Sequence, residues 1–271
     1  MLLNHILVTQ ESLDQTEPNC IVENNIDILN ALFERYVQAE EVPQAALQSY
    51  YIDYYLAQIE NGGFAQFVYN TGWHPDIIQW IEDGLQAIGA DRHLQLFKQN
   101  SEILHQFTPD QLEQFLEGEY FGENQQRDTL NAFDETFYRL NEQENLATLN
   151  QEWLKQHPLL KAIAEAELEQ YLDQIAKNIP NLQERIQAAK ANQPRYYHVV
   201  DALCEAANLQ LDRITAGDPN FQYQGQQHIS WHFLTDQGHF YMLDLDDHAL
   251  LFNDQQSEPI FTLDIQHLPK E

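Results

Sequence analysis

The stretch E-N-G-G-F-A-Q-F-V-Y-N-T-G, residues Glu60–Gly72, decides how the first half of this 271-residue chain folds. Apolar residues at helical spacing lead up to it, and Phe64, Phe67 and Val68 resume that spacing after the two glycines. Glycine closes a helix at low steric cost. A phosphate-binding loop would need a preceding strand and either a third spaced glycine or a Gly-Lys-Ser/Thr ending, and the stretch has none of these. We therefore predict a tight helical corner.

Helical periodicity extends from this corner in both directions. Apolar residues recur at intervals of three and four, and Thr108-Pro109-Asp110 has the residue order of a helix start. Residues 26–191 are accordingly predicted to form an all-helical domain, and residues 1–25 a leader with a short strand at Ile6–Val8. The predicted helices include Ala45–Glu60, Asp91–Phe107, Arg127–Gln143, Leu149–Gln156 and Leu159–Lys177.

The pattern changes near Pro194. One more helix is predicted at Tyr197–Leu211, and after it come β-rich runs separated by turn residues. Asp236-Gln237-Gly238 is predicted to link two of these strands as a hairpin. The predicted fold class is mainly α, with the all-helical N-terminal domain followed by a small α+β domain, residues 195–271, made of a helix and an antiparallel sheet.

Acidity is the outstanding feature of the composition. The chain has 43 Asp and Glu against 13 Lys and Arg, a formal net charge of −30. Such a field repels nucleic acids and anionic membranes and attracts basic partners. The N-terminus lacks the features of a secretory signal, and no apolar run approaches the roughly 18 residues of a spanning helix. Two distant cysteines form no disulfide framework, so a cytoplasmic location is expected, with neither membrane nor nucleic acid as a direct partner.

The acidic residues are unevenly distributed. Nine acids and one base, Arg127, lie between Gln99 and Glu135. Helical spacing predicts two acidic stripes, one before and one after Pro158, and further acids follow the first stripe. Since duplex DNA carries one charge per roughly 1.7 Å of its axis, two or three adjacent stripes, or a dimer, would be needed to imitate it. The predicted partner-binding residues are Asp110, Glu113, Glu117, Glu119, Glu123, Glu165, Glu169 and Asp173.

A metal-binding or catalytic function has less support in the sequence. His228 and His232 share one face of a predicted strand, and imidazole with carboxylate suits zinc or iron. The spacing matches no closed zinc signature, so turn and surface positions are the favoured interpretation. No G-x-S-x-G nucleophile motif is present. We expect neither a cofactor nor an enzyme. The weak metal-ligand candidates are His228, His232, His239, Asp244 and Asp246.

Three short motifs carry a resemblance to a known family: N-G-G-F-A-Q-F from Asn61, I-G-A from Ile88 and D-E-T-F-Y from Asp134. With them, the region Tyr50–Pro158 resembles the bacterial DNA-mimic protein family. The resemblance implies an acidic helical protein, commonly a homodimer, whose surface imitates the phosphate backbone. The motif residues are interpreted as fold determinants: Asn61, Gly62, Gly63, Phe64, Gln66, Phe67 and Asn70.

Three functional hypotheses follow. The leading one is a binding protein that occupies the nucleic-acid-binding face of a basic partner, such as a transcription factor or nucleoid protein. The second is an immunity or inhibitor protein that acts on a basic toxin. The third is a metal-dependent hydrolase that uses the C-terminal His/Asp cluster.

Overall fold

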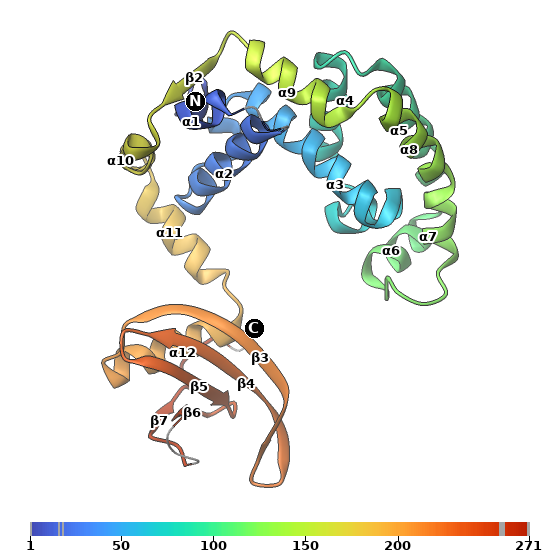
Figure 1. The fold of residues 1–271 in the computed structure, drawn as a ribbon. Helices are drawn as coiled ribbons and strands as arrows, with labels where there is room; N and C mark the ends of the chain where they lie inside the picture. The colour runs from blue at the N-terminus through green and yellow to red at the C-terminus, as the bar shows by residue number, and fades with distance from the viewer. Residues whose placement is uncertain (1, 16, 18, 255–257, 270–271) are drawn as a thin grey trace. The chain divides into compact units, whose positions relative to one another are not determined.

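The computed structural model describes residues 2–15, 17, 19–254 and 258–269. Contacts divide the chain into two compact units, Met1–Leu182 and Gln183–Glu271. Figure 1 shows both units as ribbons, and each is described here by itself.

The first unit is mostly helical. Its elements, in chain order, are β1 (Ile6–Thr9), α1 (Gln10–Asp14), α2 (Cys20–Glu34), the 3-10 helix η1 (Ala39–Glu41), α3 (Gln44–Thr71), α4 (Pro75–Ala87), α5 (Asp91–Leu104), α6 (Pro109–Glu117), α7 (Gln125–Leu130), the 3-10 helix η2 (Asn131–Phe133), α8 (Asp134–Gln143), α9 (Leu146–Gln156), β2 (Leu160–Ile163) and α10 (Glu165–Lys177).

The predicted all-helical N-terminal domain is wrong, because this unit also contains a parallel two-stranded sheet. Strand β1 pairs with β2, with Ile6 opposite Leu160 and Thr9 opposite Ile163. The predicted helix Leu159–Lys177 is therefore a strand followed by the shorter α10. All four residues of β1 are buried. Because buried backbone N–H and C=O groups require partners, β1 needs a second strand, and a segment 154 positions further along the chain supplies it.

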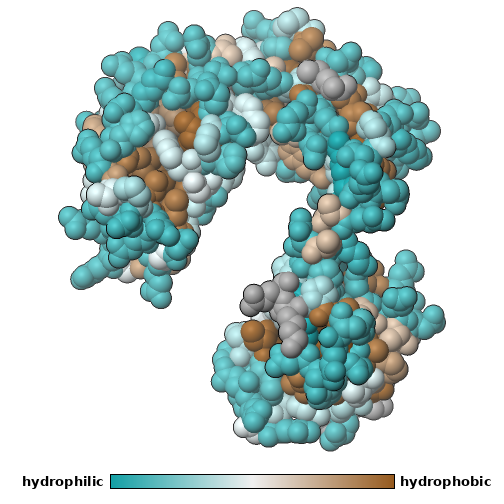
Figure 2. Space-filling model, turned by 180° about the vertical axis from the view of Figure 1, so that it is seen from behind, coloured by the Kyte–Doolittle hydropathy of each residue, from teal (hydrophilic) through white to brown (hydrophobic). Residues whose placement is uncertain are grey.

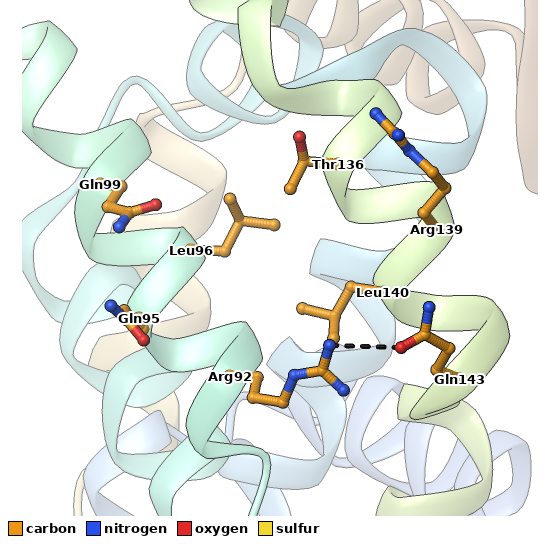
Figure 3. A pocket seen from close by; sticks show the side chains of 8 residues that line it. All are labelled: Arg92, Gln95, Leu96, Gln99, Thr136, Arg139, Leu140 and Gln143. Carbon is orange, nitrogen blue, oxygen red and sulfur yellow. Dashed lines mark hydrogen bonds between the residues drawn. The ribbon is translucent and has the colours of Figure 1, made fainter.

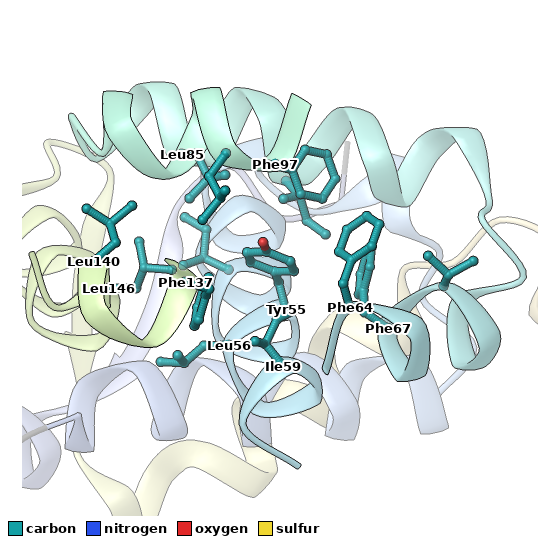
Figure 4. Close-up of a cluster of buried hydrophobic side chains, with 14 of the residues drawn as sticks. Tyr55, Leu56, Ile59, Phe64, Phe67, Leu85, Phe97, Phe137, Leu140 and Leu146 are labelled. Carbon is teal, nitrogen blue, oxygen red and sulfur yellow. The ribbon is translucent and has the colours of Figure 1, made fainter. Parts of the chain in front are cut away.

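The core of the first unit consists of two clusters. One packs around α3, where Tyr55 lies at the centre of the side chains in Figure 4, between Phe64 and Phe67 on one side and Phe137 on the other. The second cluster joins β1 and α2 to α10, and it includes Ile6, so the N-terminal segment belongs to the core. Two clusters on one long helix explain why α3 carries buried residues along most of its length.

The predicted helix Arg127–Gln143 is interrupted. The structure has α7, one turn of 3-10 helix at Asn131–Phe133, and then α8. This interruption turns the side chains of Asn131 and Asp134 toward the backbone of α3. The break is thus part of the corner described below.

The second unit contains one five-stranded antiparallel sheet. Its elements are α11 (Leu182–Ala191, whose first residue closes the first unit), α12 (Arg195–Ala207), β3 (Leu211–Tyr223), β4 (Gln226–Thr235), β5 (Gly238–Asp244), β6 (His248–Asn253) and β7 (Phe261–Asp264). The strands are neighbours in chain order. Helix α12 packs on one face through Val199, Leu203 and Cys204.

The predicted hairpin at Asp236-Gln237-Gly238 is confirmed, since β4 and β5 pair up to Thr235 and Gly238. Strand β3 was not predicted. Its sequence contains Gly217 and Pro219, its pairing with β4 is irregular at three places, and most of its residues are exposed. These are features of an edge strand, which lacks a strong apolar alternation. None of the helices in the described residues has the length and apolar character that crossing a membrane requires.

Candidate functional site

The two glycines break α3 at the predicted corner. Gly62 has φ −157° and ψ 18°, and Gly63 has φ 81° and ψ −177°, so the helix stops and restarts there. The restarted helix exposes new N–H groups, and side chains from a distant segment accept them. The Phe64 N–H donates to Asp134 Oδ1 (3.1 Å) and the Ala65 N–H donates to Asn131 Oδ1 (2.8 Å). These bonds satisfy donors that a helix start leaves without partners.

The remaining motif residues support the same corner. Phe64 and Phe67 are fully buried. On the outer side, three amides form a chain with Gln58: Asn61 donates to Gln66 (3.1 Å), while Gln66 and Asn70 donate to Gln58 Oε1 (3.0 and 2.6 Å). All of these contacts are internal to the fold. The motif therefore builds a corner and leaves no open cradle for a phosphate.

Asp134 is the half-buried acid of this corner. Burial raises the pKa of its carboxyl to about 6, against the lowering effect of the Phe64 N–H, and the neighbouring Glu135 raises it further. A shifted pKa often marks a catalytic group. Here the hydrogen bond to Phe64 explains the position of the carboxyl, so we interpret Asp134 as a helix cap.

Sequence reasoning missed four residues that hold the corner. Besides Asn131 and Asp134, Tyr120 donates its hydroxyl to the Gly62 carbonyl (3.1 Å) and Tyr138 donates to the Ile59 carbonyl (3.0 Å). Two of them, Asp134 and Tyr138, lie in the D-E-T-F-Y motif. The sequence thus contained the motif that supplies these two residues, but nothing in it indicated that this motif contacts the glycine motif.

The first acidic stripe lies on α6 and continues into the loop that follows. Thr108 caps α6 in a reciprocal pair with Gln111 (3.2 and 2.9 Å), and Pro109 occupies its first turn, which confirms the predicted helix start. Phe115 is buried while the acidic residues face solvent. We call them the α6 acidic surface: Asp110, Glu113, Glu117, Glu119 and Glu123. In the described part of the chain, none of these five carboxylates forms an ion pair.

The second stripe lies on α10 and is partly neutralised. The guanidinium of Arg35, at the end of α2, contacts Glu169 (2.5 Å) and Asp173 (3.0 Å). These two carboxylates raise the pKa of Arg35 against the lowering effect of burial, and the hydrogen bond to Asp173 is the largest cause. Glu165 is exposed at the first turn of the helix. Arg35 thus forms ion pairs with two of the three carboxylates of this stripe.

The structure does not bring the two stripes together. Helix α6 packs on α3 and α7, whereas α10 packs on α2, and the two helices lie at opposite ends of the first unit in Figure 1. Hydrophilic residues dominate the face of this unit seen in Figure 2, with hydrophobic areas between them. Within one chain, the α6 and α10 stripes therefore form two separate surfaces.

A surface hollow of about 470 Å³ lies between α5 and α8. Leu96 and Leu140 form its floor, and Arg92 reaches across from α5 to Gln143 on α8 (3.3 Å), as Figure 3 shows. Its lining includes Arg139 and no carboxylate, although Glu144 lies 3.9 Å from Arg92.

The His/Asp candidates of the second unit fall into separate groups. His232 Nδ1 lies 3.2 Å from His239 Nε2, and His239 Nδ1 lies 2.8 Å from Asp254. Burial and the neighbouring His239 lower the pKa of His232. Asp244 instead pairs with Arg195 (2.6 Å).

The remaining two candidates do not complete a site. Asp246 lies in the turn before β6 with φ 68°, and His228 pairs with Phe221 across β3 and β4. Within the described ranges, no group of three or more His, Cys, Asp and Glu side chains could hold a metal ion. The five candidates therefore do not converge on one centre.

The middle of the chain is similar to a known protein family. Residues 40–157 match the model of the family described as DMP19-like protein. This region contains α3 to α9, and with them the glycine corner and the α6 acidic surface. No curated protein and no solved structure matched the chain.

Proposed function

We propose that this protein binds a basic, nucleic-acid-binding protein and occupies its DNA-binding face with the α6 acidic surface. The observation that carries the proposal is the set of five exposed carboxylates without an ion pair in the described chain. Their location inside the region that matches the DMP19-like family supports it, because the sequence of this region resembles DNA-mimic proteins.

The α6 acidic surface is sparser than the phosphates of duplex DNA, so we propose that it pairs with a few lysine and arginine side chains of the DNA-binding face and does not copy the whole duplex. Asp110, Glu113 and Glu117 are three and four residues apart on α6, which places successive carboxylates about 4.5 to 6 Å apart along the helix axis. Like charges at this spacing destabilise an isolated helix slightly. Lysine and arginine side chains of a partner would relieve that repulsion and release bound counterions, as they do on DNA.

The α10 stripe has a smaller role in this proposal. Arg35 already satisfies Glu169 and Asp173, so a partner would have to compete with an intramolecular cation for them. Neutralising α10 is therefore a matched control for neutralising α6.

The experiment is a capture assay with three baits: the wild-type chain, the variant Asp110→Asn/Glu113→Gln/Glu117→Gln, and the control Glu165→Gln/Glu169→Gln/Asp173→Asn. We expect the wild type and the α10 control to retain a basic nucleic-acid-binding protein, which duplex DNA displaces, and the α6 variant to lose it. A captured partner that is not basic, or that DNA does not displace, would contradict the proposal.

A further inference from the structure

Phe121 is unusually exposed for a phenylalanine. Its exposed fraction is 84%, whereas Ile229, the next most exposed large hydrophobic residue in the described chain, is at 51%. A phenylalanine in water forgoes the stabilisation that its burial would bring. Isolated exposed apolar residues are common on proteins, so the exposure needs support from the surroundings of Phe121.

Contacts of Tyr120 with the glycine corner and with Arg127 fix the loop that carries Phe121. The preceding residue, Tyr120, donates to the Gly62 carbonyl of the corner (3.1 Å), and its ring packs 5.0 Å from that of Tyr69. Arg127 donates to the Tyr120 carbonyl (3.2 Å). Because the backbone next to Phe121 is already fixed, its ring can be buried by a partner at little cost in loop ordering.

Other contacts hold the far side of the loop. Asn124 donates to the Glu119 carbonyl (3.3 Å), so the chain closes on itself around Phe121 and Gly122. Gly122 has φ 89°, a conformation that glycine adopts readily. The Phe121 ring touches that of Tyr120 edge-on, at 5.5 Å between centroids. The loop therefore exposes the Phe121 side chain on a backbone that hydrogen bonds hold on both sides.

The charged residues near Phe121 determine which kind of partner can cover its ring. Glu117, Glu119 and Glu123 lie within four residues of Phe121 and are exposed. The nearby cation Arg127 is engaged with Asp128 (3.0 Å) and with the loop backbone. An anionic partner would be repelled, whereas lysines and arginines beside an apolar strip would pair with these carboxylates.

We propose that Phe121 is the anchor of the interface: it packs on an apolar strip of the partner that is flanked by lysine and arginine side chains. The proposal rests on the proposed function for the basic character of the partner. The carboxylates then supply the part of the affinity that salt removes, and Phe121 supplies a part that persists at high salt, as buried aromatic anchors do at protein interfaces.

The test uses the full chain and two synthetic helical probe peptides of equal length and charge. In one, a strip of leucines is flanked by lysines; in the other, each leucine is replaced by glutamine. Dissociation constants are measured by fluorescence anisotropy at about 0.05 M and about 0.5 M salt. The proteins are the wild type, Phe121→Ser, Phe121→Leu, the control Ile229→Ser, and the triple α6 variant.

We expect the wild type to bind the leucine peptide about tenfold more tightly than the glutamine peptide at high salt. Phe121→Ser should bring this ratio close to one, Phe121→Leu should retain most of it, and Ile229→Ser should leave it unchanged. A ratio that Phe121→Ser does not lower, or that Ile229→Ser lowers equally, would overturn the anchor role. Failure of the proposed function has a different signature: the triple α6 variant would then bind both peptides as the wild type does at low salt.

Discussion

At the scale of single residues, Gly63 is the position that the corner tolerates least. Its φ of 81° disfavours any side chain, and a Cβ there would collide with the Asp134 carboxylate and the Asn131 amide. We predict that Gly63→Ala lowers the free energy of unfolding by about 3 kcal/mol, because backbone strain and displacement of both caps add.

Gly89 provides the matched control for this substitution. Its φ is 75°, and an added Cβ would meet nothing within 4 Å. Gly89→Ala should therefore cost only about 1 kcal/mol, the strain term alone. Urea unfolding of both variants measures the difference, and equal losses would show that the caps contribute nothing.

The raised pKa of Asp134 predicts a specific pH dependence of the folding stability. Burial raises the pKa of this carboxyl to about 6 in the folded chain, above its ordinary value of 3.8. Between these values the folded state holds the proton more tightly, so the contribution of Asp134 to stability is largest below about pH 4 and is lost as the pH rises through 6.

The variant Asp134→Asn keeps an acceptor for the Phe64 N–H and cannot titrate. We predict that the wild type loses stability relative to Asp134→Asn from pH 4 to pH 6, the range between the two pKa values. Urea midpoints of both proteins across this range provide the measurement. A difference that stays constant with pH would contradict the burial of this carboxyl.

At the scale of elements, Arg35 fastens α10 to α2. Its removal leaves Glu169 and Asp173 adjacent without their cation. We predict that Arg35→Gln lowers stability by about 1 kcal/mol and increases amide exchange in α10, with a smaller effect at high salt, since the Glu169 and Asp173 side chains are largely exposed.

Arg139→Gln is the control for Arg35→Gln. Arg139 donates to the Glu135 carbonyl of its own helix and forms no ion pair with a described carboxylate. Its substitution should change stability by less than about 0.5 kcal/mol. If the two variants behave alike, the ion pairs do not stabilise the docking of α10.

The elements also mark how far the sequence predicts the fold. Local signals were sufficient for α6, whose cap, proline and apolar face are contained in ten residues, and for the β4–β5 hairpin. They failed at β2, since the apolar spacing of Leu160–Ile163 also fits a helix and only the distant β1 decides the conformation. The edge strand β3 was not predicted for the opposite reason, because its sequence has little apolar pattern at all.

The candidate site follows the same division. Helical spacing alone placed Asp110, Glu113 and Glu117 on one exposed side of α6. It could not reveal that Arg35 neutralises part of α10, because that cation lies more than 130 residues away in sequence. The caps of the glycine corner escaped prediction for the same reason, with Phe64 and Asp134 separated by 70 residues. Local periodicity predicts which residues share a face, while pairing depends on tertiary contacts.

At the scale of the whole molecule, the two compact units predict two cooperative units. Leu85 belongs to the core around α3, and Leu203 to the core between α12 and the sheet; both are fully buried. Leu→Ala substitutions at such sites cost about 2 to 5 kcal/mol. We predict that Leu203→Ala reduces hydrogen-exchange protection in residues 195–254 and leaves α3 unchanged, while Leu85→Ala does the reverse. Joint loss of protection in both regions would indicate one cooperative unit.

The central claim is that carboxylates without an intramolecular cation bind the partner. The most direct measurement is the salt dependence of the dissociation constant for the captured basic partner, compared among the wild type, the triple α6 variant and the triple α10 variant. We predict that neutralising α6 weakens binding at low salt and flattens the salt dependence, while neutralising α10 changes both much less. Equal slopes for the wild type and the α6 variant, or a larger effect of the α10 variant, would contradict the account.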